Sequence, residues 1–205
     1  MKLNKSVLLA FGLLVLSASL YRAWGDRPEG FAPQLAMAIF GGAMIRDKRL
    51  AFILPLLSML ISDSIYQLLY TNGLFDRPGF YKAQGFFDSQ LLNYVLFALL
   101  TVFGFLLKKP TALRVFGFGL SGSVLYFLAS NLLVWMGGGG FGRPKTFEGL
   151  MQCYGDALAF YREYGLIEGF AGNAVVGDLF FCALLFGSFA LLSRFFMPAA
   201  RQQAA

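Results

Sequence analysis

The chain has no histidine and only two cysteines among its 205 residues. Without histidine, common zinc sites, the HExxH motif and Ser-His-Asp catalysis are excluded. The two thiols, Cys153 and Cys182, are predicted to lie in an outer loop and inside the last apolar segment, so we expect no disulfide between them. Neither a Walker A nor a Rossmann glycine pattern occurs, so the chain cannot power transport by itself. We therefore expect no enzymatic activity, no catalytic residues, no metal and no cofactor.

Charge is scarce as well, and apolar residues take its place. Only 14% of the residues are charged, whereas 58% are hydrophobic and phenylalanine alone supplies 24 positions. The mean hydropathy of +0.64 is far from that of an average soluble domain. The apolar residues form long runs rather than a stripe along one helical face. The sequence therefore predicts a single integral membrane domain over residues 1–205.

We predict an all-α, polytopic membrane protein with six transmembrane helices, because six apolar segments approach the roughly 20 residues that a span needs. These segments are about 6–22, 33–46, 49–70, 89–107, 113–136 and 172–197. The second is short, and the turn after it leaves room only for a helical hairpin with the third. The outer loop 137–171 contains apolar residues at helical spacing over 147–164, which indicates an amphipathic helix that either lies on the membrane or caps a pocket.

Basic residues set the orientation. With the N-terminus inside, the short inner segments hold basic residues with one acid, Asp47, whereas the outer segments mix basic residues with eight acids. The inner basic residues are Lys2, Lys5, Arg46, Lys48, Arg49, Lys108, Lys109, Arg114, Arg194 and Arg201. This asymmetry satisfies the positive-inside rule. It predicts a multi-pass protein of the bacterial inner membrane with both termini in the cytoplasm, and it explains the net charge without a nucleic-acid partner.

The first apolar segment has two interpretations. Lys2 and Lys5 followed by VLLAFGLLVLSASL resemble a signal peptide with a cleavage point near residues 17–19. The apolar run, however, continues through Leu20 to Trp24, a suitable interfacial anchor, which favours a retained helix. Cleavage would leave the other five spans in the same orientation.

Polar side chains interrupt four of the apolar segments, and most lie toward the outer side. A carboxyl or amide group is costly in hydrocarbon and normally faces a bundle interior or a watery cavity. At 1.5 Å per residue, Asp63 lies roughly 20 Å from the inner end of its span, with Gln67 one turn further on the same face. We therefore predict a substrate-binding site at six positions, of which the last two are weaker: Asp63, Gln67, Asn131, Asp178, Asn93 and Asn173.

The two aspartates carry most of this argument. No lysine or arginine is expected inside any span to neutralise Asp63 or Asp178, so we expect a protonated or shared carboxyl, a bound cation or a cationic ligand group. The structural alternative is that the polar groups join helices, at about 1 kcal/mol for each amide bridge. Asn93 and Asn173 fit that alternative equally well.

Three stretches carry a family resemblance: FAPQLAMAIFGGAMIRDKRLAFILPLLSMLISD, SNLLVW and GNAVVGDLFFCALLFG. Over about residues 28–192 the chain resembles an uncharacterised bacterial membrane family that is regarded as similar to the substrate-binding S components of energy-coupling factor (ECF) transporters. Known S components have six helices, cytoplasmic termini and a vitamin or metal-ion site near the outer face, covered by outer loops. The resemblance implies uptake of a small nutrient, such as a vitamin-like compound or a cation, with an ECF-type energising module as a partner.

One departure from that pattern concerns the partner. S components commonly dock through an Ala-x-x-x-Ala pattern in the first helix, and here Ala10 is followed four residues later by Leu14. Small-residue pairs occur instead at Ala38/Gly42, Gly117/Ser121 and Gly119/Ser123, where internal packing is the default interpretation. A transporter that acts alone therefore stays open. So does a function of another class, a non-transporting membrane scaffold or assembly factor whose polar groups lock helices together.

Overall fold

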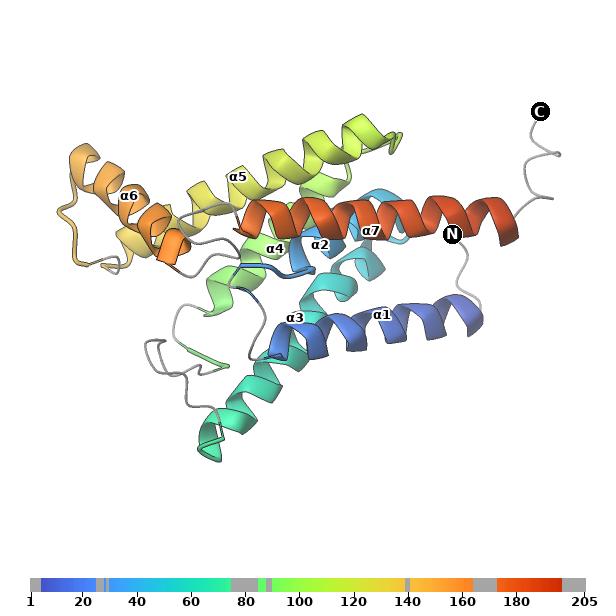
Figure 1. The fold of residues 1–205 in the computed structure, drawn as a ribbon, viewed down its shortest axis with the longest axis horizontal. Helices are drawn as coiled ribbons and strands as arrows, with labels where there is room; N and C mark the ends of the chain where they lie inside the picture. Colours follow the sequence, from blue (N-terminus) through green and yellow to red (C-terminus); the bar gives the residue numbers. More distant parts are fainter. Residues whose placement is uncertain are drawn as a thin grey trace.

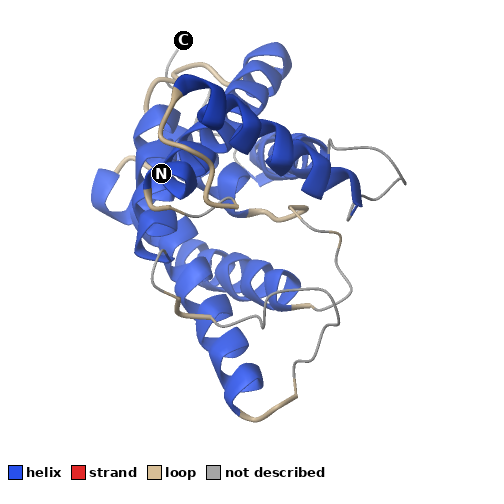
Figure 2. Cartoon of the chain, turned by 90° about the vertical axis from the view of Figure 1, so that its left-hand side faces the viewer, coloured by secondary structure: helices blue, strands red, loops and turns tan. Residues whose placement is uncertain are grey.

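Helices make up the whole fold that is described. The computed structural model describes residues 5–24, 28, 30–74, 85–87, 90–138, 141–163 and 173–196. These contain α1 (Lys5–Ala23), α2 (Gln34–Met44), α3 (Lys48–Thr71), α4 (Gln90–Gly104), α5 (Ala112–Met136), α6 (Phe147–Glu163) and α7 (Asn173–Phe196) (Figure 1). No strand occurs over these ranges (Figure 2), so the predicted all-α class is confirmed.

The short helix α2 forms the centre of the bundle and packs against α3, α4, α5 and α7. Eight of its 11 residues are buried. On one side Leu35 and Ile39 join a core with residues of α4, α5 and α7. On the other side Met37 joins a second core with Val15 of α1 and Leu54 of α3. The hydrophobicity of α2 therefore serves contact with other helices rather than with lipid.

Glycines let α2 approach its neighbours closely. A Cβ atom built on Gly42 would lie 2.2 Å from the carbonyl oxygen of Thr101 on α4, and one built on Gly104 would lie 2.7 Å from the carbonyl oxygen of Ile39. Gly119 of α5 likewise faces α7, and a Cβ atom built on it would lie 3.3 Å from Cys182 Sγ. Close backbone contact of this kind is how small residues hold helices together within membranes. The default interpretation of the small-residue pairs, internal packing, is confirmed at Gly42 and Gly119. It was wrong for Gly117/Ser121, because a Cβ atom at Gly117 would meet nothing within 4 Å and Ser121 is exposed.

The connection between α2 and α3 is short and well capped. The Asp47 side chain accepts a hydrogen bond from the backbone N–H of Arg49 at 3.0 Å, which caps the start of α3. Lys48 Nζ donates to the carbonyl oxygen of Gly42 at 2.9 Å, at the end of α2. The two helices then pack against each other, as expected for the predicted hairpin.

Three helices are long and apolar enough to cross a membrane: Lys48–Thr71, Ala112–Met136 and Ala174–Ser193. Three shorter apolar helices lie at Leu9–Ala23, Gln34–Met44 and Gln90–Gly104. Large apolar side chains such as Leu13, Leu57 and Leu191 are exposed on the outside of the bundle. An exposed apolar surface of this extent is unusual for a soluble monomer and marks contact with a membrane.

The ends of the bundle differ. Figure 1 shows the start of α1, the end of α7 and the start of α5 at one end, and α6 at the opposite end. The amphipathic helix expected within 147–164 is present as α6, which packs against α5. The candidate site lies toward this α6 end.

The two cysteines are separate. Both Cys153 of α6 and Cys182 of α7 are buried free thiols, so the expectation that they form no disulfide with each other is confirmed.

Candidate functional site

A cavity of about 410 Å³ opens among the helices of the bundle. Most of its wall is apolar or aromatic, with a few polar side chains, and Leu158 of α6 contributes to its edge. The lining residues are Arg22, Gly30, Ala32, Gln34, Leu35, Met59, Asn93, Phe97, Ser123, Val124, Tyr126, Phe127, Leu158, Ala174, Val175 and Asp178. Small-molecule sites are typically concave, apolar and of this size, with a few converging polar groups.

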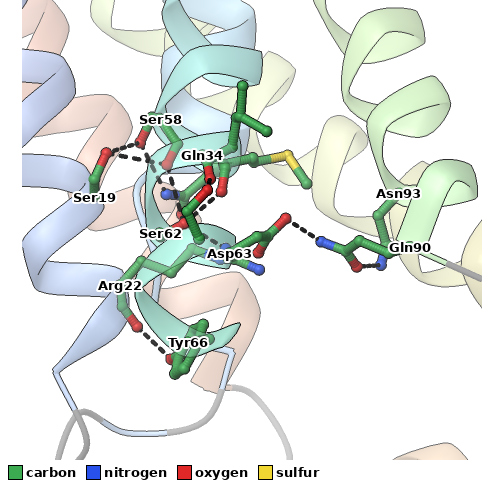
Figure 3. Close-up of polar contacts among 12 residues, drawn as sticks. Ser19, Arg22, Gln34, Ser58, Ser62, Asp63, Tyr66, Gln90 and Asn93 are labelled. Atoms are coloured by element: carbon green, nitrogen blue, oxygen red, sulfur yellow. Dashed lines mark hydrogen bonds and ion pairs between the residues drawn. The ribbon is translucent and has the colours of Figure 1, made fainter. Parts of the chain in front are cut away.

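Asp63 lies beside this cavity and is fully engaged with protein groups (Figure 3). Arg22 Nη1 donates to Asp63 Oδ1 and forms an ion pair with it. The Tyr94 hydroxyl donates to Asp63 Oδ2 at 2.7 Å, and Gln90 Nε2 donates to the same oxygen. The expectation that no basic residue neutralises Asp63 was therefore wrong. Arg22 belongs to the last turn of α1, which packs along α3, and not to the outer loop.

The polar contacts continue from Asp63 across two further helices. Gln90 Oε1 accepts a hydrogen bond from Asn93 Nδ2 at 2.9 Å, and Asn93 Oδ1 accepts one from the Tyr126 hydroxyl at 3.2 Å. The network thus runs from Arg22 on α1 through α3 and α4 to α5. Arg22, Asn93 and Tyr126 also line the cavity, so the network forms part of its wall.

Asp178 is the second buried carboxyl, and its surroundings are different. It is only 6% exposed, lines the cavity and accepts one hydrogen bond, from Ser123 Oγ to Oδ2 at 2.6 Å. Among the residues that the structure describes, no lysine or arginine forms an ion pair with it. The expectation of an unneutralised carboxyl therefore holds for Asp178 within that part of the chain. An ionised carboxylate in such a place is costly without a positive partner.

Gln34 at the start of α2 is a polar group that the sequence did not mark. Its side chain is 2% exposed and lines the cavity. Gln34 Nε2 donates to Ser58 Oγ at 3.2 Å, while Gln34 Oε1 is buried and has no hydrogen-bond partner among the described residues. Buried acceptors are nearly always satisfied, so an open one beside a cavity indicates a place for a donor.

Gln67 and Asn131 lie outside the cavity wall. Gln67 Oε1 accepts a hydrogen bond from the backbone N–H of Phe86 at 3.3 Å, which ties residues 85–87 to α3. Asn131 Nδ2 donates to the carbonyl oxygen of Phe127 within α5 at 2.8 Å. Asn173 begins α7, and its side chain falls outside the described part of the structure. Of the six predicted positions, Asn93 and Asp178 line the cavity, and Asp63 is joined to it through Arg22.

Helix α6 is held over one side of the cavity by contacts with α5 and with the segment before α6. Arg143 makes two hydrogen bonds to Asp156, from Nε at 2.8 Å and from Nη2 at 3.0 Å. The hydrogen bonds from Arg143 hold the pKa of the Asp156 carboxyl below its usual value. The Tyr154 hydroxyl donates to the carbonyl oxygen of Leu128 on α5 at 3.0 Å. Leu158, one turn beyond Tyr154 along the helix, lines the cavity.

The residues missed by the sequence analysis had weak signals. Ser58 and Ser62 repeat at helical spacing on α3, one turn apart and next to Asp63, which marks a polar face. Arg22 and Gln90 stand at the ends of the predicted spans 6–22 and 89–107, where the sequence pattern does not place a side chain inside the bundle. Their roles depend on how helices pack, which single-segment patterns do not contain.

No metal-binding cluster is apparent over the described ranges, in which no three His, Cys, Asp or Glu side chains come together. The arrangement instead favours an organic molecule held by an apolar wall and a few hydrogen-bonding groups.

Comparison with known proteins gives one match. A family described as "Family of unknown function (DUF6580)" matches residues 1–201. No curated protein and no solved structure matches the chain.

Proposed function

We propose a function for this chain, which belongs to the DUF6580 family of unknown function, from the geometry of its own site. The protein binds a small nutrient in the cavity among its helices and takes part in moving it across the bacterial inner membrane. The observation that carries the proposal is the cavity of about 410 Å³, with its aromatic wall and few converging polar groups.

The proposed membrane arrangement has six spans and cytoplasmic termini. α3, α5 and α7 cross the bilayer fully, and α1, α2 and α4 complete the bundle. An 11-residue helix such as α2 rises only about 16 Å, but it is enclosed by other helices and has no need to match the lipid thickness. The start of α1 and the end of α7 share one end of the bundle, which supports placing both termini on one side (Figure 1).

Helix α1 is retained in this proposal rather than removed as a signal peptide. Val15 and Ala18 are buried within the core that contains Leu54 of α3. Ser19 Oγ donates to the carbonyl oxygen of Ser58 on α3 at 3.0 Å, and Arg22 pairs with Asp63. Removal of this helix would leave these groups of α3 without their partners.

The nearest functional analogy is to the S components of ECF transporters. The six spans, cytoplasmic termini and outer site of this proposal are also those of that type of protein. α6 then acts as the cover of the site, and an energising partner or an ion gradient drives release. The vitamin-like or cationic nature of the nutrient belongs to this proposal.

A scaffold function has one specific observation in its favour. Every carboxylate oxygen of Asp63 is satisfied by protein groups, and the resulting network joins α1, α3, α4 and α5. A network of this kind stabilises a helical bundle without any ligand. The cavity beside it is what distinguishes the binding protein from the scaffold, because its wall holds the Gln34 acceptor and the Asp178 carboxyl, which have no donor and no basic partner, respectively, among the described residues.

The test is native mass spectrometry of protein gently extracted from its host membrane. Wild type should carry a small molecule of defined mass. Ala174→Phe, which fills the cavity from α7, should lose that molecule while staying folded. Val176→Phe places the same ring on the same helix at a position that is 41% exposed and outside the cavity wall, and it should keep the molecule. An empty wild-type bundle would favour the scaffold.

A further inference from the structure

Several hydrogen-bond donors in the cavity wall are already bonded to other protein groups. The Ser123 hydroxyl donates to Asp178, the Tyr126 hydroxyl donates to Asn93, and the Arg22 guanidinium donates to Asp63. Each of these polar side chains of the wall thus directs a donor at another protein group.

Two acceptors remain unused. Gln34 Oε1 is buried and has no partner among the described residues. Asp178 accepts a hydrogen bond from Ser123 at Oδ2 alone, so its other oxygen has no donor within the described part of the chain. Because an amide oxygen and a carboxylate oxygen can only accept, both can receive hydrogen bonds from donors of a bound molecule.

The charges in the cavity wall indicate that the ligand is positively charged. Arg22 and Asp63, which form an ion pair, contribute no net charge to the wall. Asp178 has no positive partner among the described residues, so its ionised form leaves one negative charge beside an apolar cavity. A buried carboxylate in a membrane protein is normally matched by a cation.

The aromatic wall suits the same kind of ligand. Phe97 and Tyr126 both line the cavity, with ring centroids 5.1 Å apart, and Phe127 lies on the same helix as Tyr126. The faces of aromatic rings carry negative potential and attract organic cations, and their surfaces bury apolar bodies.

We infer that the cavity selects a small organic cation, in which a protonated nitrogen donates hydrogen bonds to Asp178 and Gln34 while an apolar or aromatic body packs against Phe97 and Phe127. This inference rests on the proposed function, because it names the substrate class of the same cavity. It gives the two aspartates different roles: Asp178 binds the ligand, and Asp63 joins helices of the protein.

The experiment uses three matched probes with one phenyl ring and a similar chain: 2-phenylethylamine, 2-phenylethanol and 3-phenylpropanoate. Binding of each to the full-length protein in lipid nanodiscs is measured by equilibrium dialysis. The amine should bind at least about tenfold more tightly than the alcohol or the carboxylate, since one charged hydrogen bond in a dry site is worth that factor or more.

Variants then locate the selectivity. Asp178→Asn keeps an acceptor for Ser123 but removes the charge, and it should abolish the preference for the amine. Gln34→Met keeps the side-chain length and removes the acceptor, and it should weaken amine binding. Asp47→Asn is the matched control, because it removes a carboxylate outside the cavity wall while asparagine still caps α3, and it should keep the preference for the amine.

The outcomes distinguish failure of the cation inference from failure of the proposed binding function. Tighter binding of the alcohol or the carboxylate, or an unchanged amine preference in Asp178→Asn, would overturn the cation inference and leave a binding protein of another specificity. Binding of none of the three probes, together with no molecule retained by the extracted wild type, would overturn both the inference and the proposed function.

Discussion

Arg22, in the last turn of α1, donates a hydrogen bond from Nη1 to Asp63 Oδ1 on α3, and the pair joins these two helices through residues that are 41 positions apart in the sequence. Tyr66, one turn beyond Ser62, donates its hydroxyl hydrogen to the carbonyl oxygen of Arg22, and the guanidinium lies 5.7 Å from the Tyr66 ring centre. Residues of α3 thus both hold Arg22 in place and neutralise its charge. The pair explains how a carboxyl group is accommodated inside an apolar bundle.

Asp63→Asn should destabilise the folded protein. Removing one member of a buried ion pair leaves the other charge uncompensated, which costs about 3 kcal/mol. The measurement is thermal unfolding in detergent, with Arg22→Met/Asp63→Leu as the matched double variant. The double variant should recover much of the lost stability, since no charge is left without its partner. Equal losses for the single and double variants would show that the pair itself is not what holds α1 to α3.

Gln34→Met should leave the empty protein at least as stable as the wild type, although it changes a fully buried residue. The substitution removes a buried acceptor without a partner, a defect worth about 1–3 kcal/mol, and gives up one hydrogen bond to Ser58 worth about 1 kcal/mol. Unfolding temperatures of ligand-free protein would measure this. A loss of several degrees in Gln34→Met would show that Gln34 serves the fold rather than a ligand.

Gly42→Ala should be strongly destabilising. Its new Cβ atom would lie 2.2 Å from the carbonyl oxygen of Thr101, so α2 and α4 would have to separate, at a cost of about 1–3 kcal/mol. Gly117→Ala is the matched control, because a Cβ atom there meets nothing within 4 Å. That variant should be neutral or slightly stabilised, since alanine favours helix over glycine. Similar stabilities of the two variants would contradict the close α2–α4 contact.

The docking of α6 should weaken in acid. Because Arg143 lowers the pKa of Asp156 in the folded state, the pair contributes stability above the ordinary aspartate pKa, and this contribution is lost as the pH falls through the lowered value. Spin labels at Val134 on α5 and Met151 on α6 would report the distance between the helices by electron paramagnetic resonance. The distance distribution should broaden below about pH 4.

Asp156→Asn is the control for that measurement. This variant lacks the titrating carboxyl, so its distance distribution should already be broad at neutral pH and should change less on acidification. Because both side chains are partly exposed to water, the effect should also shrink at high salt. A wild-type distribution that is the same at all pH values would show that other contacts, such as that of Tyr154 with Leu128, hold α6 in place.

The sequence predicts the helices well but the site only in part. Apolar runs mark α3, α5 and α7 because each is long, and the turn at residues 45–47 follows from its charges and caps. α2 is harder to interpret: its short apolar run suits a membrane span as well as a central helix, and only its packing against four neighbours distinguishes the two.

The different surroundings of the two aspartates could not be predicted from the sequence either. Asp63 and Asp178 have the same kind of apolar context in the sequence, yet one meets Arg22 and the other meets only Ser123 among the described residues. The difference arises from which helix packs beside each carboxyl. Asn93 lines the cavity, but its link to Tyr126 depends on the contact between α4 and α5.

The most direct test of the account locates the bound molecule. A diazirine-bearing amino acid is introduced at Leu158, which lines the cavity, and in a separate protein at Met151, which lies on the same helix outside the cavity wall with similar exposure, 47% against 43%. After irradiation of protein in its native membrane, mass spectrometry of the α6 peptide measures adducts. The account predicts a small-molecule adduct of one defined mass at position 158 and none at 151. Lipid adducts alone, or the same adduct at both positions, would contradict a ligand-binding cavity beneath α6.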